Sequence, residues 1–458
     1  MDGRSPIEKN KQYGIEIIDM GHSGEGIGKV NNFTIFVEKS VIGDKLIVEI
    51  TTLKKNYAIG EIVEYLEASP FRIEAKCPIF NECGGCQIQN MHYEKQLELK
   101  KKIVVDSLER IGGIENPPVE DTIGMNDPYR YRNKGQFPVG WADSKMRIGF
   151  YAKKSHEIID CESCLILYDK SDEIIAKMRR LITKHAIQPY SEVKGKGFLR
   201  HLVIKQGYKT DEIMVILVTN GRDFKGSDAF VKDILREIPE ITSLVQNINT
   251  KKSNVILGGE NIVLHGNSYI RDFIKELEFK ISPHSFFQVN PEQTEKLYAT
   301  ALSYADLKGD EIVFDLYSGI GTISLFLAQK AKKVIGVEIV EEAVKDAREN
   351  AKLNRISNAE FFVGKAEDVV PELYKEGYRA DIVVVDPPRK GCDNILLDTM
   401  IKMNPKKIIY VSCNPATLAR DVKRLVSEGY RLTKVQPVDM FPHGMHVEVT
   451  TLLQRVVH

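Results

Sequence analysis

Three short polar segments in the C-terminal part of the chain contain residues that could do chemistry. The first is a glycine turn suited to a small-molecule cofactor, the second is a rigid loop with a carboxylate and a guanidinium, and the third places a cysteine beside a helix start. Together they predict methyl transfer to a carbon that a thiolate first activates by covalent attack. The segments are Asp315-Leu316-Tyr317-Ser318-Gly319-Ile320-Gly321, Asp386-Pro387-Pro388-Arg389 and Ser412-Cys413-Asn414-Pro415.

The glycine turn favours one cofactor over another. Gly319 and Gly321 allow the backbone to approach a ligand closely. Glu338 follows about 20 residues later, where an acidic residue typically receives ribose hydroxyls in nucleotide sites. Dinucleotide sites share this spacing, but the turn here lacks the third glycine that packs helix to strand beneath a pyrophosphate. The turn therefore favours S-adenosylmethionine over NAD.

Cys413 and Glu448 form a candidate nucleophile and base. A thiol near a helix N-terminus has its thiolate favoured by the helix dipole. Thiolate addition at C6 of a uracil ring would make C5 reactive enough to attack a sulfonium methyl group, and a base must then remove the C5 proton. Burial in an apolar strand would raise the pKa of Glu448 and suit it to that task. The structural alternatives are a buried, inert Cys413 and a surface Glu448 on an edge strand.

The segments with chemistry follow near-continuous apolar runs that alternate with predicted helices. Strands buried on both faces, each ending in a polar residue, predict a doubly wound parallel sheet. In such a sheet the ligand site lies outside the carboxyl ends of the strands. The predicted strands are residues 311–315, 333–338, 381–386 and 407–412.

The N-terminal part has a different pattern. Residues 12–69 alternate apolar and polar positions between glycines, which predicts a small barrel of the oligonucleotide-binding type. Lys54-Lys55-Asn56-Tyr57 is either a nucleic-acid contact or a solvated lysine pair. Lys+Arg and Asp+Glu both number 64, and this balance does not exclude a nucleic-acid partner. No apolar run reaches membrane-spanning length and the N-terminus is charged, so we expect a cytoplasmic protein without a membrane partner.

Together these segments resemble the RNA uracil-C5 methyltransferase family, the bacterial type with an N-terminal TRAM domain. The resemblance covers essentially the whole chain and implies an α/β fold: an OB-like TRAM barrel (residues 1–69), a central α+β domain (70–275) and a Rossmann-like class I methyltransferase domain (276–458). The further matching segments are Tyr131-Arg132-Asn133-Lys134, Ser285-Phe286-Phe287-Gln288-Val289-Asn290, Lys390-Gly391 and His446-Val447-Glu448.

The resemblance also implies site residues and a substrate. It implies Cys413 as nucleophile, Glu448 as base and Phe286 as a stacking partner for a flipped base. The N-terminal extension is similar to the branch that makes 5-methyluridine in 23S rRNA, with tRNA as the alternative substrate, and no protein partner is evident. The implied contacts to S-adenosylmethionine are Gln288, Tyr317, Glu338 and Asp386.

Three cysteines form a tight loop, Cys77-x5-Cys83-x2-Cys86, and an odd total of 7 cysteines argues against disulfides. Spacing alone fits zinc or an iron–sulfur cluster, and either needs a fourth ligand, with Cys161 and Cys164 as candidates. The family resemblance implies a [4Fe-4S] cluster with Cys164 as the fourth ligand and Cys161 as a buried spare. Cys392 is expected to be a packed thiol.

Other functions fit these residues less well. Methylation of RNA cytosine at C5 would require a cysteine directly after the Pro-Pro pair, where Arg389 stands. An RNA-binding assembly factor without activity would not need Cys413, Glu448 and Gln288 together. An iron–sulfur redox enzyme would need a flavin or NAD site, and the sequence shows none.

Overall fold

The computed structural model describes residues 6–142, 145–223 and 226–456. The chain divides into two compact units. One comprises Met1–Lys100, Tyr151–Glu157 and Phe441–His446, and the other comprises Lys101–Phe150, Ile158–Met440 and Val447–His458. Within the described ranges, no helix combines the length and the apolar character needed to cross a membrane.

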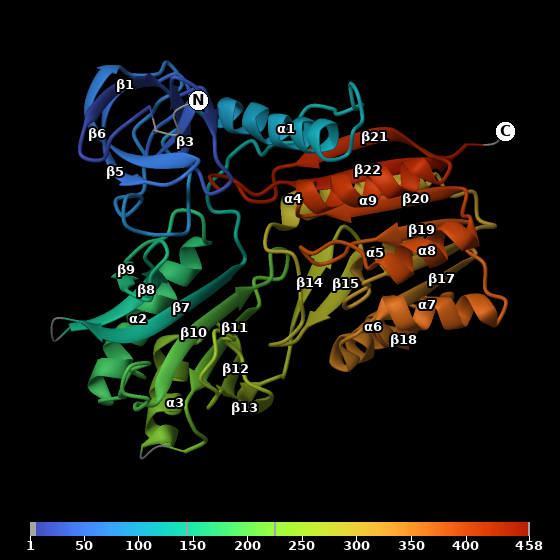
Figure 1. The fold of residues 1–458 in the computed structure, drawn as a ribbon. Coiled ribbons are helices and arrows are strands. Elements are labelled where there is room, and N and C mark those ends of the chain that lie inside the picture. Colours follow the sequence, from blue (N-terminus) through green and yellow to red (C-terminus); the bar gives the residue numbers. More distant parts are fainter. Residues whose placement is uncertain (1–5, 143–144, 224–225, 457–458) are drawn as a thin grey trace. The chain divides into compact units, whose positions relative to one another are not determined.

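The first unit contains a six-stranded sheet in the order β1-β5-β6-β4-β3-β2 (Figure 1). Only β4 and β6 pair in parallel, and β1 also packs against β3, so the sheet curls on itself. Alternate residues, such as Leu46, Val48 and Ile50, are buried inside it, which confirms the predicted period of two. The strands are β1 Gln12–Glu16, β2 Asp19–Met20, β3 Gly26–Val30, β4 Phe33–Val37, β5 Lys45–Leu53 and β6 Tyr57–Glu67.

The second unit begins within helix α1, Tyr93–Arg110, and continues into a seven-stranded mixed sheet in the order β13-β12-β11-β10-β7-β8-β9. Helices α2, Asp169–Lys184, and α3, Ser227–Glu237, share one core with β10 and β11. Lys205 lies on the opposite face of β10 from Leu202 and Ile204, which belong to that core. The strands are β7 Lys134–Ala142, β8 Lys145–Tyr151, β9 Ile158–Asp160, β10 Leu199–Gln206, β11 Ile213–Thr219, β12 Ile241–Ile248 and β13 Glu260–Gly266.

A hairpin of β14, Ile270–Ile274, and β15, Leu277–Ile281, leads into the third sheet. This sheet has the order β18-β17-β16-β19-β20-β22-β21, in which the first five strands run parallel and β22 is antiparallel to both neighbours. It confirms the predicted α/β fold. Its strands are β16 Ile312–Leu316, β17 Lys333–Glu338, β18 Ala359–Val363, β19 Ile382–Val385, β20 Lys407–Ser412, β21 Tyr430–Val438 and β22 Glu448–Arg455.

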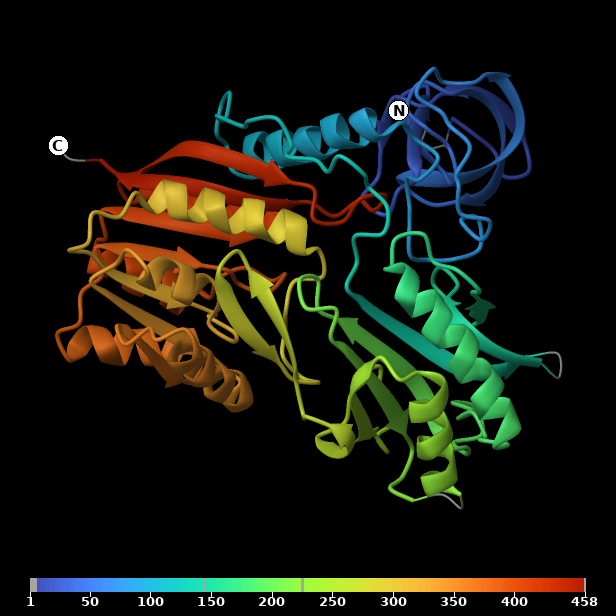
Figure 2. The ribbon, with the colours of Figure 1, turned by 180° about the vertical axis from the view of Figure 1, so that it is seen from behind.

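Helices cover both faces of this sheet, as a doubly wound fold requires. Helices α7, Ala366–Lys375, α8, Asn394–Met403, and α9, Pro415–Ser427, pack side by side and bury apolar residues in one large core (Figure 1). From behind, α4, Pro291–Ala305, lies in front of the sheet (Figure 2), where it contacts α5, Thr322–Ala328. Helix α6, Glu341–Leu353, packs against β17, β18 and β15.

Candidate active site

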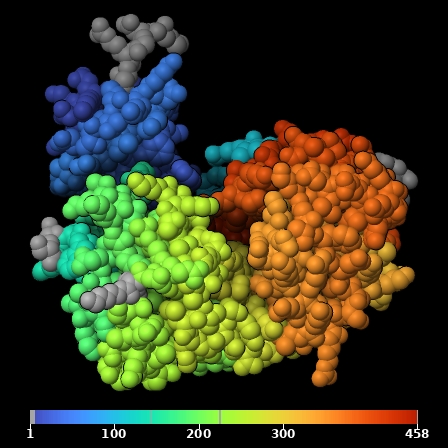
Figure 3. All heavy atoms as spheres, turned by 90° about the horizontal axis from the view of Figure 1, so that it is seen from below, coloured from blue at the N-terminus to red at the C-terminus, as the bar shows by residue number. Residues whose placement is uncertain are grey.

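The polar segments singled out above meet at one edge of the third sheet. Strands β17, β16, β19 and β20 are consecutive neighbours and run parallel, so their carboxyl ends lie side by side. Between the yellow and the orange parts of the second unit the molecular surface is hollowed (Figure 3). A ligand site outside the carboxyl ends of parallel strands is the arrangement expected for this fold.

The glycine turn after β16 is strained at a residue that is not glycine. Tyr317 has a φ of 70°, and its N–H donates to Val337 O at 2.9 Å. Gly319 and Gly321 also have positive φ, and Gly321 is the N-cap of α5. Glu338 Oε2 accepts the Gly319 N–H at 3.0 Å, so the acidic residue predicted for ribose holds the turn itself. Strain of this kind clusters where a ligand binds.

Two buried polar atoms at this turn have no hydrogen-bond partner among the described residues, Asp315 Oδ1 and Ser318 Oγ. Asp315 Oδ2 accepts a hydrogen bond from Ser324 Oγ. Burial, together with the charges of Asp386 and Glu338, raises the pKa of Asp315 to about 7. A Cβ added at Gly319 would meet nothing within 4 Å, so the turn borders open space. Unpaired buried acceptors beside open space fit a ligand that brings hydrogen-bond donors.

Cys413 and Glu448 are brought together by strand pairing. Ser412 ends β20 and pairs with Val449 of β22 as the last pair of the antiparallel ladder, and Cys413 and Glu448 are the residues next to that pair. Glu448 is 4% exposed and lies on an internal strand, so the alternative of an edge-strand surface residue is wrong. Cys413 is half-buried and directly precedes Asn414, the N-cap of α9.

The charges at these strand ends are coupled. Burial, and then the charge of Asp386, raise the pKa of Glu448 to about 8, whereas Arg389 lowers it. Burial alone raises the pKa of Asp386 to about 6. A carboxyl whose pKa lies near neutrality can exchange protons readily with a substrate.

The pKa of the Cys413 thiol is not lowered, as its place beside a helix start had predicted, but raised. Burial, followed by the charges of Glu448 and Asp386, raises the pKa of Cys413 to about 11, and Arg389 opposes this rise. In the ligand-free protein the two carboxylates and burial therefore outweigh the helix dipole. A bound cation would shift the balance back toward the thiolate, because opposite charge favours the charged form of its neighbour.

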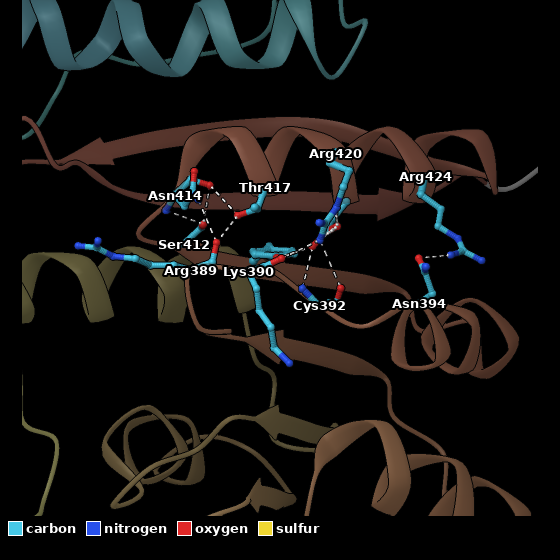
Figure 4. A network of polar contacts seen from close by, with 11 residues as sticks. Arg389, Lys390, Cys392, Asn394, Ser412, Asn414, Thr417, Arg420 and Arg424 are labelled. Carbon is cyan, nitrogen blue, oxygen red and sulfur yellow. Dashed lines mark hydrogen bonds and ion pairs between the residues drawn. The ribbon is translucent and has the colours of Figure 1, made fainter. Parts of the chain in front are cut away.

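The Pro-Pro loop is bonded to the turn that carries Cys413 (Figure 4). Asn414 Nδ2 donates to Arg389 O at 3.0 Å, and Thr417 Oγ1 donates to the same carbonyl at 3.2 Å. Ser412 Oγ and the Asn414 backbone close the turn with two bonds of 3.1 Å. The loop with Arg389 and the turn with Cys413 thus form one bonded structure.

Cys392 follows the same loop but is not available for reaction. It is 5% exposed within the core beneath α7, α8 and α9. Burial raises the pKa of its thiol to about 12. The prediction of a packed thiol is confirmed, and a nucleophile after the Pro-Pro pair, as cytosine methylation would require, is absent from this part of the described chain.

The segment with Phe286 and Gln288 is held by the central sheet. Asn133 donates its side-chain N–H to Gln288 O at 3.1 Å and its backbone N–H to Val289 O at 2.9 Å. Lys205 Nζ donates to Ser282 O at 2.8 Å and to Ser285 O at 3.1 Å. Phe286 is 69% exposed, whereas Gln288 is buried two residues before Asn290, the N-cap of α4. The loop displays an aromatic ring on a fixed backbone.

Sequence reasoning missed three residues here. Lys205 directly follows the apolar run Leu202-Val203-Ile204. A lysine at the end of an apolar strand is the only feature of the sequence that could have marked it. The hydroxyl oxygen of Tyr298, on α4, lies 3.2 Å from Thr322 Oγ1. Burial raises the pKa of this hydroxyl, and the charges of Asp386, Asp315 and Glu448 raise it further. Asp421 is a charge on the apolar stripe of α9 formed by Leu418, Val422 and Leu425, and that position could have been noticed.

The cysteine loop lies in the first unit. Cys83 Sγ accepts the Gly85 N–H at 3.3 Å, and the Cys77 N–H donates to Gln89 Oε1 at 2.7 Å. Cys164, in the second unit, is half-buried, and its carbonyl accepts a hydrogen bond from Arg130 Nη1. Cys161 is 4% exposed. Within residues 6–142, 145–223 and 226–456, no group of three or more His, Cys, Asp or Glu side chains is arranged to hold a metal ion.

Two family models match this chain. The model described as tRNA (Uracil-5-)-methyltransferase matches residues 92–456, and the TRAM domain model matches residues 8–63. The chain belongs to the tRNA (uracil-5-)-methyltransferase family. This membership identifies it as an RNA methyltransferase with a TRAM domain, as the resemblance implied.

Relatives of this family methyltransferase match it over nearly their whole length. A protein of Bacillus cereus named "Uncharacterized RNA methyltransferase" is 50% identical over 451 residues, covering 98% of both chains. One of Clostridium tetani with the same name is 50% identical over 448 residues, covering 98% of this chain and 97% of the other. A crystal structure of Pyrococcus abyssi tRNA (uracil-54, C5)-methyltransferase with S-adenosyl-L-homocysteine aligns with a TM-score of 0.76 and 29% identity, covering 96% of this chain and 100% of that one.

Proposed function

We propose that this protein transfers a methyl group from S-adenosylmethionine to C5 of uridine in RNA through a covalent bond between Cys413 and C6. The observation that carries the proposal is the pairing of β20 with β22, which sets a thiol and a buried carboxyl beside the last pair of the ladder. Asp386 and Arg389 lie close enough to shift the pKa of both groups. A nucleophile, a base and a cation at one strand edge are the parts that this reaction needs.

Cys413 begins the reaction. Its thiol loses a proton to solvent, and the thiolate forms the S–C6 bond while the C5–C6 π electrons move onto C5. The nucleophilic C5 then takes the methyl group. Glu448 finally removes the C5 proton, the C–H electrons restore the C5–C6 double bond, and the S–C6 bond breaks to return the thiolate. The products are 5-methyluridine, S-adenosylhomocysteine and one proton, so atoms and charge balance.

Residues of three neighbouring strand ends would hold the methyl donor. S-adenosylmethionine supplies the methyl group from a positively charged sulfur. Tyr317 and Glu338 border the glycine turn after β16, and Asp386 follows β19. Gln288 completes the proposed set from the loop that Asn133 fixes. The unpaired acceptors of Asp315 and Ser318 support this placement.

The proposed substrate is an RNA. We expect 23S rRNA, with tRNA as the alternative. The tRNA alternative is supported by a Pyrococcus abyssi enzyme named for tRNA, which aligns with 96% of this chain. We propose that the TRAM barrel (residues 1–69) and the central domain (70–275) bind the RNA in the cytoplasm, and that residues 276–458 carry out the chemistry.

A [4Fe-4S] cluster held by Cys77, Cys83, Cys86 and Cys164 is part of the same proposal. The N–H bond to Cys83 Sγ resembles those that cluster sulfurs receive, and the half-buried Cys164 suits a ligand better than the buried Cys161. No chemical step above uses it. Iron and sulfide analysis of anaerobically purified protein tests it: Cys164→Ser should lose iron and Cys161→Ser should keep it.

Trapping with 5-fluorouridine tests the main reaction. Fluorine at C5 cannot leave as a proton, so the bond to Cys413 should persist after denaturation when S-adenosylmethionine is present. We expect an adduct on a 23S rRNA fragment, with Cys413→Ala as the control without adduct. An adduct on tRNA alone would keep the mechanism and change the substrate. No adduct on either RNA, with the cofactor bound, would overturn the proposed reaction in favour of an RNA-binding role.

A further inference from the structure

The loop that follows Asp386 is bonded to the first two turns of α9 (Figure 4). Two donors of α9, Asn414 and Thr417, bond the carbonyl of Arg389. Arg420 Nη2 donates to Lys390 O at 3.0 Å and to Cys392 O at 3.4 Å. The backbone from residue 389 to 392 is therefore shaped by side chains of a helix that starts beside Cys413.

A single buried carboxylate joins three segments of this region. Asp421 is 1% exposed, and its Oδ2 accepts the Cys392 N–H at 2.9 Å and the Tyr410 hydroxyl at 2.7 Å. Its Oδ1 accepts Arg420 Nε at 2.8 Å. Tyr410 lies in β20, three residues before Cys413. The Arg420–Asp421 pair thus connects the Pro-Pro loop, the strand that ends at the nucleophile and the helix that follows it.

Gly391 shows how closely the loop follows the pair. Its φ is +79°, and a Cβ at this position would lie 2.6 Å from both Arg420 Nη2 and Asp421 Oδ2. A side chain here would displace one of those groups or the loop itself. The backbone of the loop therefore packs directly against the Arg420–Asp421 pair.

We propose that Arg420 and Asp421 are positioning residues that fix Arg389 relative to Cys413 and Glu448. The inference rests on the proposed function. Arg389 lowers the pKa of both reacting groups, and the strength of that effect falls with distance. Arg389 enters from the loop after β19 and Cys413 from the end of β20, so a bond between the two segments must set the distance. The pair supplies such a bond at Lys390 and Cys392, in addition to those that Asn414 and Thr417 make to Arg389 O.

A purely structural role for the pair makes a different prediction. If it only stabilised α9 and its loop, its loss would lower the free energy of unfolding and leave the pH dependence of the reaction unchanged. If it positions Arg389, its loss must raise the pH at which the reaction reaches half its maximal rate. The direction is upward because a more distant cation lowers the pKa of its neighbours less.

Single-turnover methyl transfer measured against pH tests the inference in the full-length protein. We expect Arg389→Gln and Arg420→Ala each to move the midpoint upward by roughly 1 pH unit. The double variant should move it no further, because both changes remove the same interaction. Arg424→Ala is the matched control: Arg424 also projects from α9, but it bonds Asn394 at 2.7 Å and Asp398 on α8. It should leave the midpoint in place.

Two outcomes would overturn the inference: an unchanged midpoint in Arg420→Ala, or additive shifts in the double variant. If Arg420→Ala does not fold, Arg420→Lys serves in its place, because it keeps the positive charge and removes the guanidinium that bonds both Lys390 O and Asp421. Trapping of the wild-type protein with 5-fluorouridine separates the two proposals. A wild-type adduct together with an unshifted Arg420→Ala profile would reject the positioning role alone.

Discussion

The proposed chemistry depends on two residues, Cys413 and Glu448, that lie 35 positions apart in the chain and beside the last pair of the β20–β22 ladder. Neither has its ordinary proton affinity, since the pKa of the thiol is raised to about 11 and that of the carboxyl to about 8. The charge of Glu448 contributes to the raised pKa of Cys413, so a thiolate beside an ionised Glu448 is disfavoured. In the proposed reaction the thiolate of Cys413 attacks first and the carboxylate of Glu448 acts last.

Glu448→Gln should separate these two steps. The amide cannot take the C5 proton, so the RNA bond to Cys413 should form and fail to resolve. We expect turnover to fall by roughly 10²–10⁴-fold, while adduct on ordinary RNA accumulates with S-adenosylmethionine. Gel electrophoresis under denaturing conditions measures the adduct. Glu448→Gln that turns over at the wild-type rate would assign the base to another residue.

The pH dependence of the rate gives a second prediction at this scale. Because the base must be ionised, the single-turnover rate should rise with pH and bend near the pKa of about 8 found for Glu448. Asp386→Asn removes a negative charge that raises this pKa, so the bend should move to lower pH. Rates measured from pH 6 to 9.5 under saturating cofactor check it. A bend that stays fixed in Asp386→Asn would contradict the charge coupling.

At the scale of elements, the parallel strands β16, β19 and the antiparallel β22 gather three buried carboxyls at one edge. Burial raises the pKa of Asp315 to about 7, of Asp386 to about 6 and of Glu448 to about 8. The fold tolerates these groups because they can stay protonated in the absence of ligand. A sheet that concentrates negative charge in this way is suited to a positively charged methyl donor.

This arrangement predicts how stability changes with pH. Each folded pKa lies above its unfolded value, so the folded protein binds more protons, and stability should fall as pH rises from about 4 to about 8. Glu448→Gln removes one of the three carboxyls, so the free energy of unfolding should fall less steeply with pH at the upper end of this range. Urea unfolding of the ligand-free protein at pH 5, 6.5 and 8 measures the effect. A free energy of unfolding that rises over this window would reject the assignment.

The loop with Phe286 and Gln288 gives another prediction for elements. Lys205→Met leaves the carbonyls of Ser282 and Ser285 without their buried donor, which should cost about 1–3 kcal/mol of stability. It should also weaken cofactor binding through the loop. Lys209→Met, which breaks a half-exposed ion pair with Glu295, is the control and should cost under about 1 kcal/mol. Urea unfolding measures the stability of both variants, and cofactor titration measures their affinity. Equal losses in Lys205→Met and Lys209→Met would show that Lys205 does not hold the loop.

At the scale of the whole molecule, the TRAM barrel and the methyltransferase sheet belong to different compact units. The barrel exposes Lys54 and Lys55 at the turn between β5 and β6, next to Tyr57, whose ring packs edge-on against Phe36. A basic turn beside an aromatic ring is suited to single-stranded RNA. The residues proposed to bind the cofactor, Gln288, Tyr317, Glu338 and Asp386, all belong to the other unit.

The separation predicts that RNA and cofactor affinities can be changed independently. Lys54→Ala with Lys55→Ala should weaken RNA binding and reduce the slope of log K against log salt by up to about 1.4. Cofactor affinity should not change. Lys45→Ala, on the same barrel but paired with Glu67, is the control and should have a smaller effect. Salt titrations of RNA binding test this, and an unchanged slope would place the RNA contact elsewhere.

Much of this protein was determined by its sequence alone. The apolar runs at 333–338 and 407–412 coincide with β17 and β20, because strands buried on both faces are near-continuous apolar runs. The predicted strand over 381–386 is shorter in the structure, where β19 spans Ile382–Val385. The family was also evident from the sequence, because several short motifs that are common singly occur together in this chain.

Only the tertiary structure decided the state of the site. The sequence predicted a thiolate favoured by a helix start, but a pKa depends on every charge within several ångströms, and Glu448 and Asp386 come from strands distant in sequence. The sequence also gave no sign that Asp421 joins Cys392 to Tyr410. Hydrogen bonds between segments are set by register and packing, and local pattern carries no information about partners that meet only when the sheet is complete.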